Sequence, residues 1–181
     1  MADFPLGYLP SHQVISTLSA ESGATACGAF DFSAPAGASA WPASFRIMYV
    51  PLNLTHPFLV SLFWWANGTS LNGEVEAGIY SKSGVRIAAT GSVLQSGIAT
   101  RTQSAAPTIG TFLLPPDFYY LALTLSGSGR IYKILGTLTQ LRQLNVYEET
   151  PGAFGLPATA TFGTNASGWY PVLGISEHTV I

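Results

Sequence analysis

The stretch that decides the fold is Glu74-Val75-Glu76-Ala77-Gly78-Ile79-Tyr80, followed by Ser81-Lys82-Ser83-Gly84 and Val85-Arg86-Ile87-Ala88-Ala89. Apolar and polar side chains alternate along its first half, which is the period-two pattern of a strand with one buried and one solvated face. Gly84 can supply the positive φ that a tight turn needs. The pattern predicts an antiparallel hairpin over 74–89, with Glu74, Glu76 and Tyr80 facing water and the following side chains buried: Val75, Ala77, Ile79, Val85 and Ile87.

Short β-runs separated by turn residues continue on both sides of this hairpin, from Trp41 onward. Such a succession is typical of a sandwich or a barrel. We therefore expect an all-β fold, a jelly-roll-like antiparallel β-sandwich formed by residues 41–181. The expected strands are 44–50, 57–66, 73–81, 85–90, 98–103, 108–114, 118–125, 130–135, 158–162 and 169–175.

Residues 1–40 are rich in Ala, Ser, Gly and Pro and contain few large apolar side chains. We interpret them as an extended N-terminal arm with short strands at 13–18 and 27–32. One short helix is expected after Thr137, because Thr137 and Gln140 match a capping box. The leucines that follow recur on one side, and Asn145 is expected to end the helix; these leucines are Leu138, Leu141 and Leu144.

Two of the expected strands are apolar on both faces. In 58–65 the adjacent residues Trp64 and Trp65 must point to opposite faces, and in 118–125 the same holds for large side chains such as Phe118 and Tyr119. Antiparallel strands usually present one polar face to water. Either the arm or the leucine helix covers the second face, or these strands lie in a subunit interface. The candidate interface residues are Trp64, Trp65, Phe118 and Tyr120.

Charged residues make up only 9% of the chain, whereas about 25% is usual. A surface so poor in charge is expected to be covered by partners. The net charge of −2 and the scattered Lys and Arg residues give no basic patch, so we expect no nucleic-acid partner. The strongest apolar run, 58–66, is far shorter than the roughly 20 residues of a membrane-spanning helix. The first residues lack the pattern of a secretory signal, and no membrane association is expected.

The residues that usually carry chemistry are sparse. His12, His56 and His178 match no metal-ligand spacing, and Cys27, the single cysteine, is expected to be a small buried side chain. No phosphate loop, dinucleotide fingerprint or nucleophile elbow is present. A glycosidase pair among Glu74, Glu76, Glu148 and Glu149 stays open as an alternative, although the first two fit the solvated face of the hairpin better. We expect no catalytic residue, no metal site and no cofactor.

Two stretches of the chain carry a resemblance. They are residues 78–92 with Gln95-Ser96-Gly97, and Leu114-Pro115-Pro116-Asp117-Phe118-Tyr119-Tyr120-Leu121-Ala122-Leu123. Together they resemble a module common in tail-fibre and other structural proteins of tailed bacteriophages, except that Asp117 stands near the place of a usual turn glycine. The resemblance covers about residues 57–135 and concerns scaffold positions only. It implies a β-sandwich in a virion component, often a homotrimer, made in the host cytoplasm, where an unpaired Cys27 is expected.

We therefore expect a virion structural protein, such as a head decoration, neck or tail component, that contacts other virion proteins and copies of itself, with a trimer the first choice. The alternative is a tail-fibre-type module that recognises host surface carbohydrate. Sugar rings stack on aromatic side chains, and their hydroxyls need polar partners. Trp169 and Tyr170 beside Asn165 form the candidate carbohydrate contact, and a role of Trp169 in the core is the competing interpretation.

Overall fold

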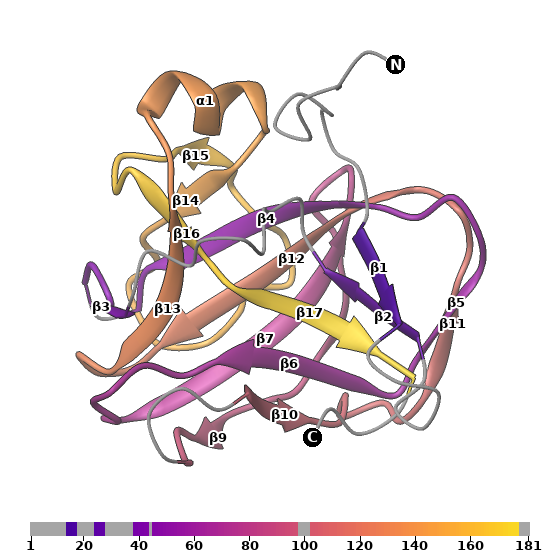
Figure 1. Ribbon diagram of the computed structural model, residues 1–181, viewed down its shortest axis with the longest axis horizontal. Helices are drawn as coiled ribbons and strands as arrows, with labels where there is room; N and C mark the ends of the chain where they lie inside the picture. Colours follow the sequence, from indigo (N-terminus) through magenta and orange to yellow (C-terminus); the bar gives the residue numbers. More distant parts are fainter. Residues whose placement is uncertain (1–13, 18–23, 28–37, 44, 98–101, 178–181) are drawn as a thin grey trace, which may run out of the picture.

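The computed structural model describes residues 14–17, 24–27, 38–43, 45–97 and 102–177, and every strand pairing in this part of the chain is antiparallel (Figure 1). The predicted all-β sandwich with one short helix is confirmed. The strands are β1 (Val14–Thr17), β2 (Ala24–Cys27), β3 (Ala38–Ala40), β4 (Ile47–Asn53), β5 (Phe58–Val60), β6 (Leu62–Ala66), β7 (Glu74–Ser81), β8 (Arg86–Ala89), β9 (Val93–Leu94), β10 (Thr102–Ala105), β11 (Phe112–Leu114), β12 (Phe118–Leu125), β13 (Arg130–Leu135), β14 (Tyr147–Glu149), β15 (Gly163–Thr164), β16 (Trp169–Pro171) and β17 (Leu173–Ser176).

The largest sheet has the strand order β15-β14-β4-β12-β7-β8, and β9 pairs with the start of β7. β12 lies at its centre, where Leu121 pairs with Val50 of β4 on one side and with Ile79 of β7 on the other. The two stretches that carry the bacteriophage resemblance therefore lie on neighbouring strands, because 78–92 contains β8 and the second half of β7.

A second sheet, with the order β1-β2-β17-β6-β10, packs across the first (Figure 1). The main core lies between the two sheets and contains side chains from both, including Leu121, Ile79 and Phe63. Tyr119, Leu121 and Leu123 are buried in it. Two small sheets complete the fold: a ribbon of β5 and β11, and a three-stranded sheet of the order β16-β13-β3.

The opposite face of the large sheet is also covered. Tyr49, Tyr80 and Tyr120 form a second apolar cluster there with Leu156 and Phe162. The residues that cover them belong to the segment 150–162, named the covering segment below, and to β14 beside it. Among the described residues this layer comes from neither the helix nor the strands of the arm, which were the two intramolecular covers expected. The second apolar face of β12 is thus buried inside the chain.

The predicted hairpin forms with a different register in its second strand. Val75, Ala77 and Ile79 are buried as expected, but Val85 is 53% exposed and Ile87 is 36% exposed. A bulge between the pairs Tyr80–Arg86 and Ile79–Ala88 inserts Ile87 as an extra residue. Ala88 therefore takes the core position expected for Ile87. Glu76 and Tyr80, expected to face water, are buried beneath the covering segment.

The predicted helix is α1 (Leu138–Gln143), and its capping box is present as expected. The Gln140 N–H donates to the Thr137 hydroxyl, and the Thr137 N–H donates to the Gln140 side chain. Asn145 has a φ of +57° and ends the helix, as predicted. Of the three expected leucines only Leu141 is buried; Leu138 is exposed and Leu144 is half-buried.

Other strands differ from expectation in their limits. The run 57–66 is divided into β5 and β6, and 169–175 is divided into β16 and β17. The run 158–162 forms only an isolated bridge between Thr159 and Val85, while β14 and β15 were not foreseen. Within residues 1–40 the structure describes β1 and β2, which extend the second sheet from β17, and β3, which pairs with β13. The remaining residues of the expected arm, with His12, lie outside the described residues, as do His178 and the side chain of Cys27.

Candidate functional site

The residues expected to form a carbohydrate contact are buried. Trp169 and Tyr170 lie on β16 within the main core, and the Trp169 ring packs edge-on against Trp41 at 5.6 Å. The Asn165 amide donates to the Trp169 carbonyl at 3.1 Å and accepts from the Gly168 N–H at 3.1 Å. No ring face is left for a sugar here. The competing interpretation, a core role for Trp169, describes this site.

Three of the four candidate interface residues are buried as well. Trp64 and Trp65 are both buried within the single chain, and Tyr120 is buried while Phe118 is half-buried. Neither tryptophan of β6 is therefore available to a partner in the single chain. Within the described part of the chain the indole N–H groups of both tryptophans have no hydrogen-bond acceptor. Tyr120 packs on Phe162 of the covering segment, with ring centroids 4.5 Å apart.

The buried and half-buried carboxylates hold loops in place. Glu148 accepts hydrogen bonds from the Ala166 and Ser167 N–H groups at 3.1 and 2.7 Å, and its second oxygen lies 2.9 Å from the Arg46 guanidinium. Its neighbour Glu149 points to the other side of β14 and accepts from the Tyr49 hydroxyl and the Thr161 N–H.

Glu76 of β7 plays the same structural role. Its carboxylate accepts from the Leu156 N–H at 2.9 Å, and Arg86 donates to the Leu156 carbonyl. In each case the acceptor is bonded to main-chain donors of the C-terminal loops, an arrangement that orders those loops. The four glutamates left open above as a glycosidase pair are thus divided between an exposed position, Glu74, and three loop contacts.

Burial also determines the titration of the tyrosines beneath the covering segment. Loss of water contact, assisted by the neighbouring Tyr147, raises the pKa of Tyr120 to about 12. Burial, together with the hydrogen bond to Glu149, raises the pKa of Tyr49 well above its usual value. Burial likewise raises the pKa of Tyr80, although Arg86 opposes part of that effect. The Tyr49 and Tyr80 hydroxyls donate hydrogen bonds to Glu149 and to the Pro157 carbonyl.

A buried amide network joins the loops at the far end of the large sheet. The Asn67 amide donates to the Ser96 carbonyl and to Gln103, and it accepts from Gln95. Gln95 also donates to the Arg130 carbonyl and accepts from the Asn72 N–H. All amide hydrogens of Asn67 and Gln95 are used, so this network stabilises loops and has no capacity for a ligand.

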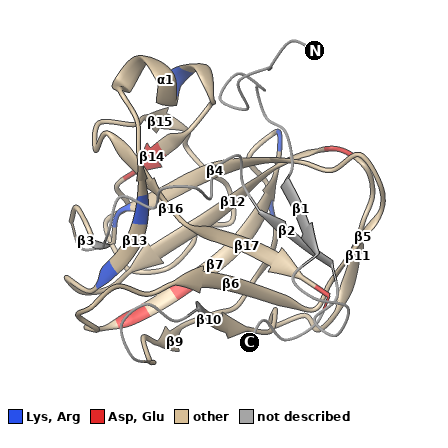
Figure 2. Cartoon of the chain, in the orientation of Figure 1, with Lys and Arg blue, Asp and Glu red and all other residues tan. Residues whose placement is uncertain are grey.

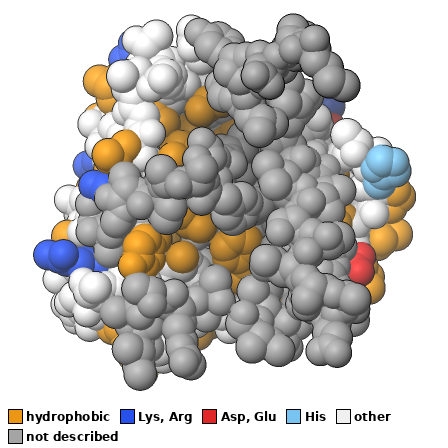
Figure 3. Space-filling model, in the orientation of Figure 1, with side chains coloured by type: hydrophobic (Ala, Val, Ile, Leu, Met, Phe, Trp, Pro, Cys, Tyr) orange, Lys and Arg blue, Asp and Glu red, His pale blue; other side chains and the backbone are white. Residues whose placement is uncertain are grey.

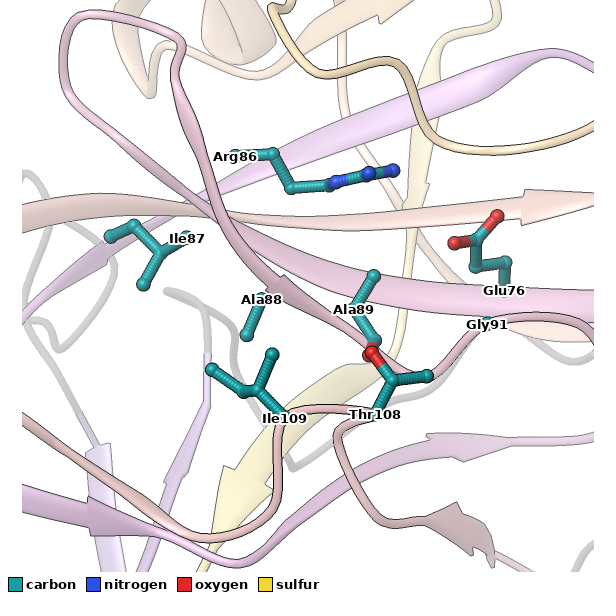
Figure 4. A pocket seen from close by; sticks show the side chains of 8 residues that line it. All are labelled: Glu76, Arg86, Ile87, Ala88, Ala89, Gly91, Thr108 and Ile109. Carbon is teal, nitrogen blue, oxygen red and sulfur yellow. The ribbon is translucent and has the colours of Figure 1, made fainter.

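A half-open groove of about 380 Å³ follows the outer edge of β8. Figure 4 shows the charged groups of Glu76 and Arg86 at one end and the aliphatic side chains of Ile87 and Ile109 toward the other. Ile109 belongs to the turn before β11 and is 63% exposed. Glu76 and Arg86 form no ion pair in the described residues, because each binds the main chain of Leu156. The remaining lining residues are Ala88, Ala89, Gly91 and Thr108.

A second apolar surface lies on the β5–β11 ribbon. Leu59 and Leu113 pair directly across its two strands, and they are 40% and 64% exposed. The alternate residues of the ribbon, Phe58, Val60 and Leu114, face inward and are buried. Hydrophobic side chains gather at the edge of the molecule where the ribbon lies (Figures 1 and 3). Charged side chains are few throughout the described part of the chain (Figure 2).

The described residues contain no helix that is long and apolar enough to cross a membrane. They also contain no group of three or more His, Cys, Asp or Glu side chains arranged to hold a metal ion. His56, the one histidine among them, is exposed and shares a hydrogen bond with Thr55.

No protein-family model, no curated protein and no solved structure matches the chain.

Proposed function

We propose that this protein is a structural subunit without catalytic activity, which works through contacts with copies of itself and with other proteins of an assembly. The observation that carries the proposal is the paired leucine face of the β5–β11 ribbon. Leu59 and Leu113 lie opposite each other on the outer side of the ribbon, and both are exposed. Adjacent exposed aliphatic side chains on a chain with 9% charged residues favour a protein partner.

The use made of the acidic side chains supports the same proposal. A general acid or base needs a carboxylate that can reach a substrate. Glu76, Glu148 and Glu149 are instead bonded to main-chain N–H groups of the C-terminal loops. The carbohydrate-binding alternative has lost its proposed contact, because Trp169, Tyr170 and Asn165 are buried.

The assembly we propose is the particle of a tailed bacteriophage, with the protein as a head decoration, neck or tail component. The support is the resemblance of 78–92 and 114–123 to the β-sandwich module of such particles. These stretches pair with each other in the large sheet, with Tyr120 opposite Tyr80 and Leu121 opposite Ile79. The homotrimer that the resemblance implies is the oligomer we propose.

Sedimentation velocity of the double variant Leu59→Ser/Leu113→Ser tests the role of the ribbon. We expect wild-type protein to self-associate and the double variant to associate at least about tenfold more weakly, because its contact face has become polar. The matched control is Leu94→Ser/Leu135→Ser, which changes leucines that are 70% and 58% exposed elsewhere on the surface. Equal association of all three proteins would refute a role of the ribbon.

A further inference from the structure

The covering segment binds the large sheet mainly through its main chain. The Leu156 N–H donates to Glu76 at 2.9 Å, and the Leu156 carbonyl accepts from Arg86. The next carbonyl, that of Pro157, accepts from the Tyr80 hydroxyl at 2.7 Å. Three side chains of β7 and β8 thus hold the main chain of two consecutive residues, Leu156 and Pro157, and these contacts do not depend on the side chains of the bound residues.

The same segment also forms a short antiparallel bridge with the main chain at the start of β8. The Arg86 N–H donates to the Ala158 carbonyl at 2.9 Å, and the Ala160 N–H donates to the Gly84 carbonyl at 2.8 Å. Val85 and Thr159 form the antiparallel bridge between these bonds. This is the geometry by which a peptide is added to a sheet edge.

The pairing stops at a proline. The register of the bridge would place Pro157 opposite Ile87, and proline has no N–H to donate. The segment leaves the edge at this residue and crosses the face of the sheet. Ile87 is left beside the groove, and the turn containing Thr108, which also lines the groove, donates the Thr108 N–H to the Ala89 carbonyl.

One side chain of the segment is recognised specifically. Leu156 is buried in the second apolar cluster, above Gly78 of β7. A Cβ at position 78 would lie only 2.6 Å from the Leu156 Cδ1 atom and 2.9 Å from the Ala88 carbonyl oxygen. Glycine at this position therefore creates the hollow that the leucine fills. Main-chain hydrogen bonds supply affinity and a single pocket supplies selectivity, as in peptide recognition.

We propose that β7 and β8 form a peptide-binding site, which the chain fills with its own residues 155–160. The ligand class is an extended peptide with a small residue, a leucine, a proline and a second small residue in succession. The partner that carries this sequence is a second copy of the chain. The tethered segment has a high effective concentration, so the site is closed in the isolated subunit and opens only when the segment is released. This inference goes beyond the proposed function and does not depend on the leucine face of the ribbon.

Hydrogen exchange of the wild-type protein tests whether the segment is separable. The Leu156 and Ala160 amides donate into the site, and we expect them to exchange through a local opening at least about a hundredfold faster than the Leu121 and Ala122 amides of β12. Equal protection of both groups, lost only on global unfolding, would show that the segment is an integral part of the fold and would overturn the proposal.

Peptide binding in trans tests recognition. A labelled peptide of residues 153–161 is titrated into the Leu156→Asp variant, in which a charge replaces the side chain that fills the hollow. We expect this variant to bind the peptide at least about tenfold more tightly than wild type, because its own segment competes less well. Leu135→Asp, the same substitution at a leucine that is 58% exposed and lies outside the segment, should behave like wild type. A peptide with aspartate in place of leucine should bind to none of them.

The folded state of the Leu156→Asp variant is checked by circular dichroism. A folded variant that does not bind the leucine peptide would refute recognition. If the variant does not fold, the hydrogen-exchange comparison in wild type still decides, since its two outcomes are exclusive. Neither experiment measures self-association through Leu59 and Leu113. A negative result for the peptide-binding site would therefore not contradict the proposed function.

Discussion

The Arg46 guanidinium lies 2.9 Å from the carboxylate of Glu148, and this pair joins the start of β4 to β14. Glu148 is buried and also accepts two N–H groups from the loop before Trp169, whereas a quarter of the Arg46 side chain remains exposed. The pair therefore fixes the loop that precedes β16. It is a structural contact between residues 102 positions apart in the chain.

Replacing Glu148 by alanine should lower the free energy of unfolding by about 3 kcal/mol, because Arg46 and two loop N–H groups lose their acceptor. Chemical denaturation monitored by tryptophan fluorescence measures the loss. Glu74→Ala, at an exposed position, is the control and should change stability by less than about 0.5 kcal/mol. Equal effects of the two substitutions would contradict the role assigned to Glu148.

Replacing Leu121 by alanine should cost about 2–5 kcal/mol, the range for a buried leucine whose removal leaves a cavity. Leu121 is fully buried at the centre of the large sheet, paired with both neighbouring strands. The exposed Leu135 provides the matched control, with an expected loss below about 0.5 kcal/mol. An unchanged melting temperature for Leu121→Ala would show that β12 is misplaced.

Replacing Trp169 by alanine should affect stability and not sugar binding. The ring is buried between Trp41 and the rest of the core, so we expect a loss of about 3–5 kcal/mol. A glycan array with wild-type protein should show no binding that depends on this residue. Specific glycan binding that Trp169→Ala abolishes without loss of stability would restore the carbohydrate-binding alternative.

Stability should fall in alkaline solution because of the buried tyrosines. In the unfolded chain tyrosine has a pKa of about 10, and in the folded protein burial raises the pKa of Tyr120 to about 12. The folded state therefore holds its phenol protons more strongly, and the stability this provides is complete below pH 10 and lost as pH rises toward 12. Each such tyrosine adds a slope of up to about 1.4 kcal/mol per pH unit. In Tyr120→Phe the free energy of unfolding should fall less steeply with pH, by the contribution of one tyrosine. An unchanged slope would contradict the burial of Tyr120.

Local sequence patterns predicted the elements whose determinants are local. β12 and β13 have the predicted limits, since each is a continuous apolar run between turn residues. The capping box at Thr137 and the stop at Asn145 depend only on neighbouring residues. The hairpin was predicted, but its bulge at Ile87 was not. Which residue is extra depends on the contacts of both strand faces, and those contacts are tertiary.

The second layer over the large sheet could not be predicted for a similar reason. The covering segment has no apolar periodicity, and only Leu156 and Phe162 mark it as a buried element. The alternation in β7 indicated that Glu76 would face water. That prediction failed because an alternating pattern carries no information about a later loop that returns to cover the polar face of the strand. Gly78 was the available signal: a glycine inside a strand indicates the close approach of another part of the chain.

Native mass spectrometry of the wild-type protein tests the central claim, that the chain is a self-assembling subunit, most directly. The account predicts a discrete oligomer, with a trimer first, whose population falls in Leu59→Ser/Leu113→Ser and not in Leu94→Ser/Leu135→Ser. A protein that remains monomeric up to about 100 µM, a concentration at which even a weak specific interface would be occupied, would contradict it.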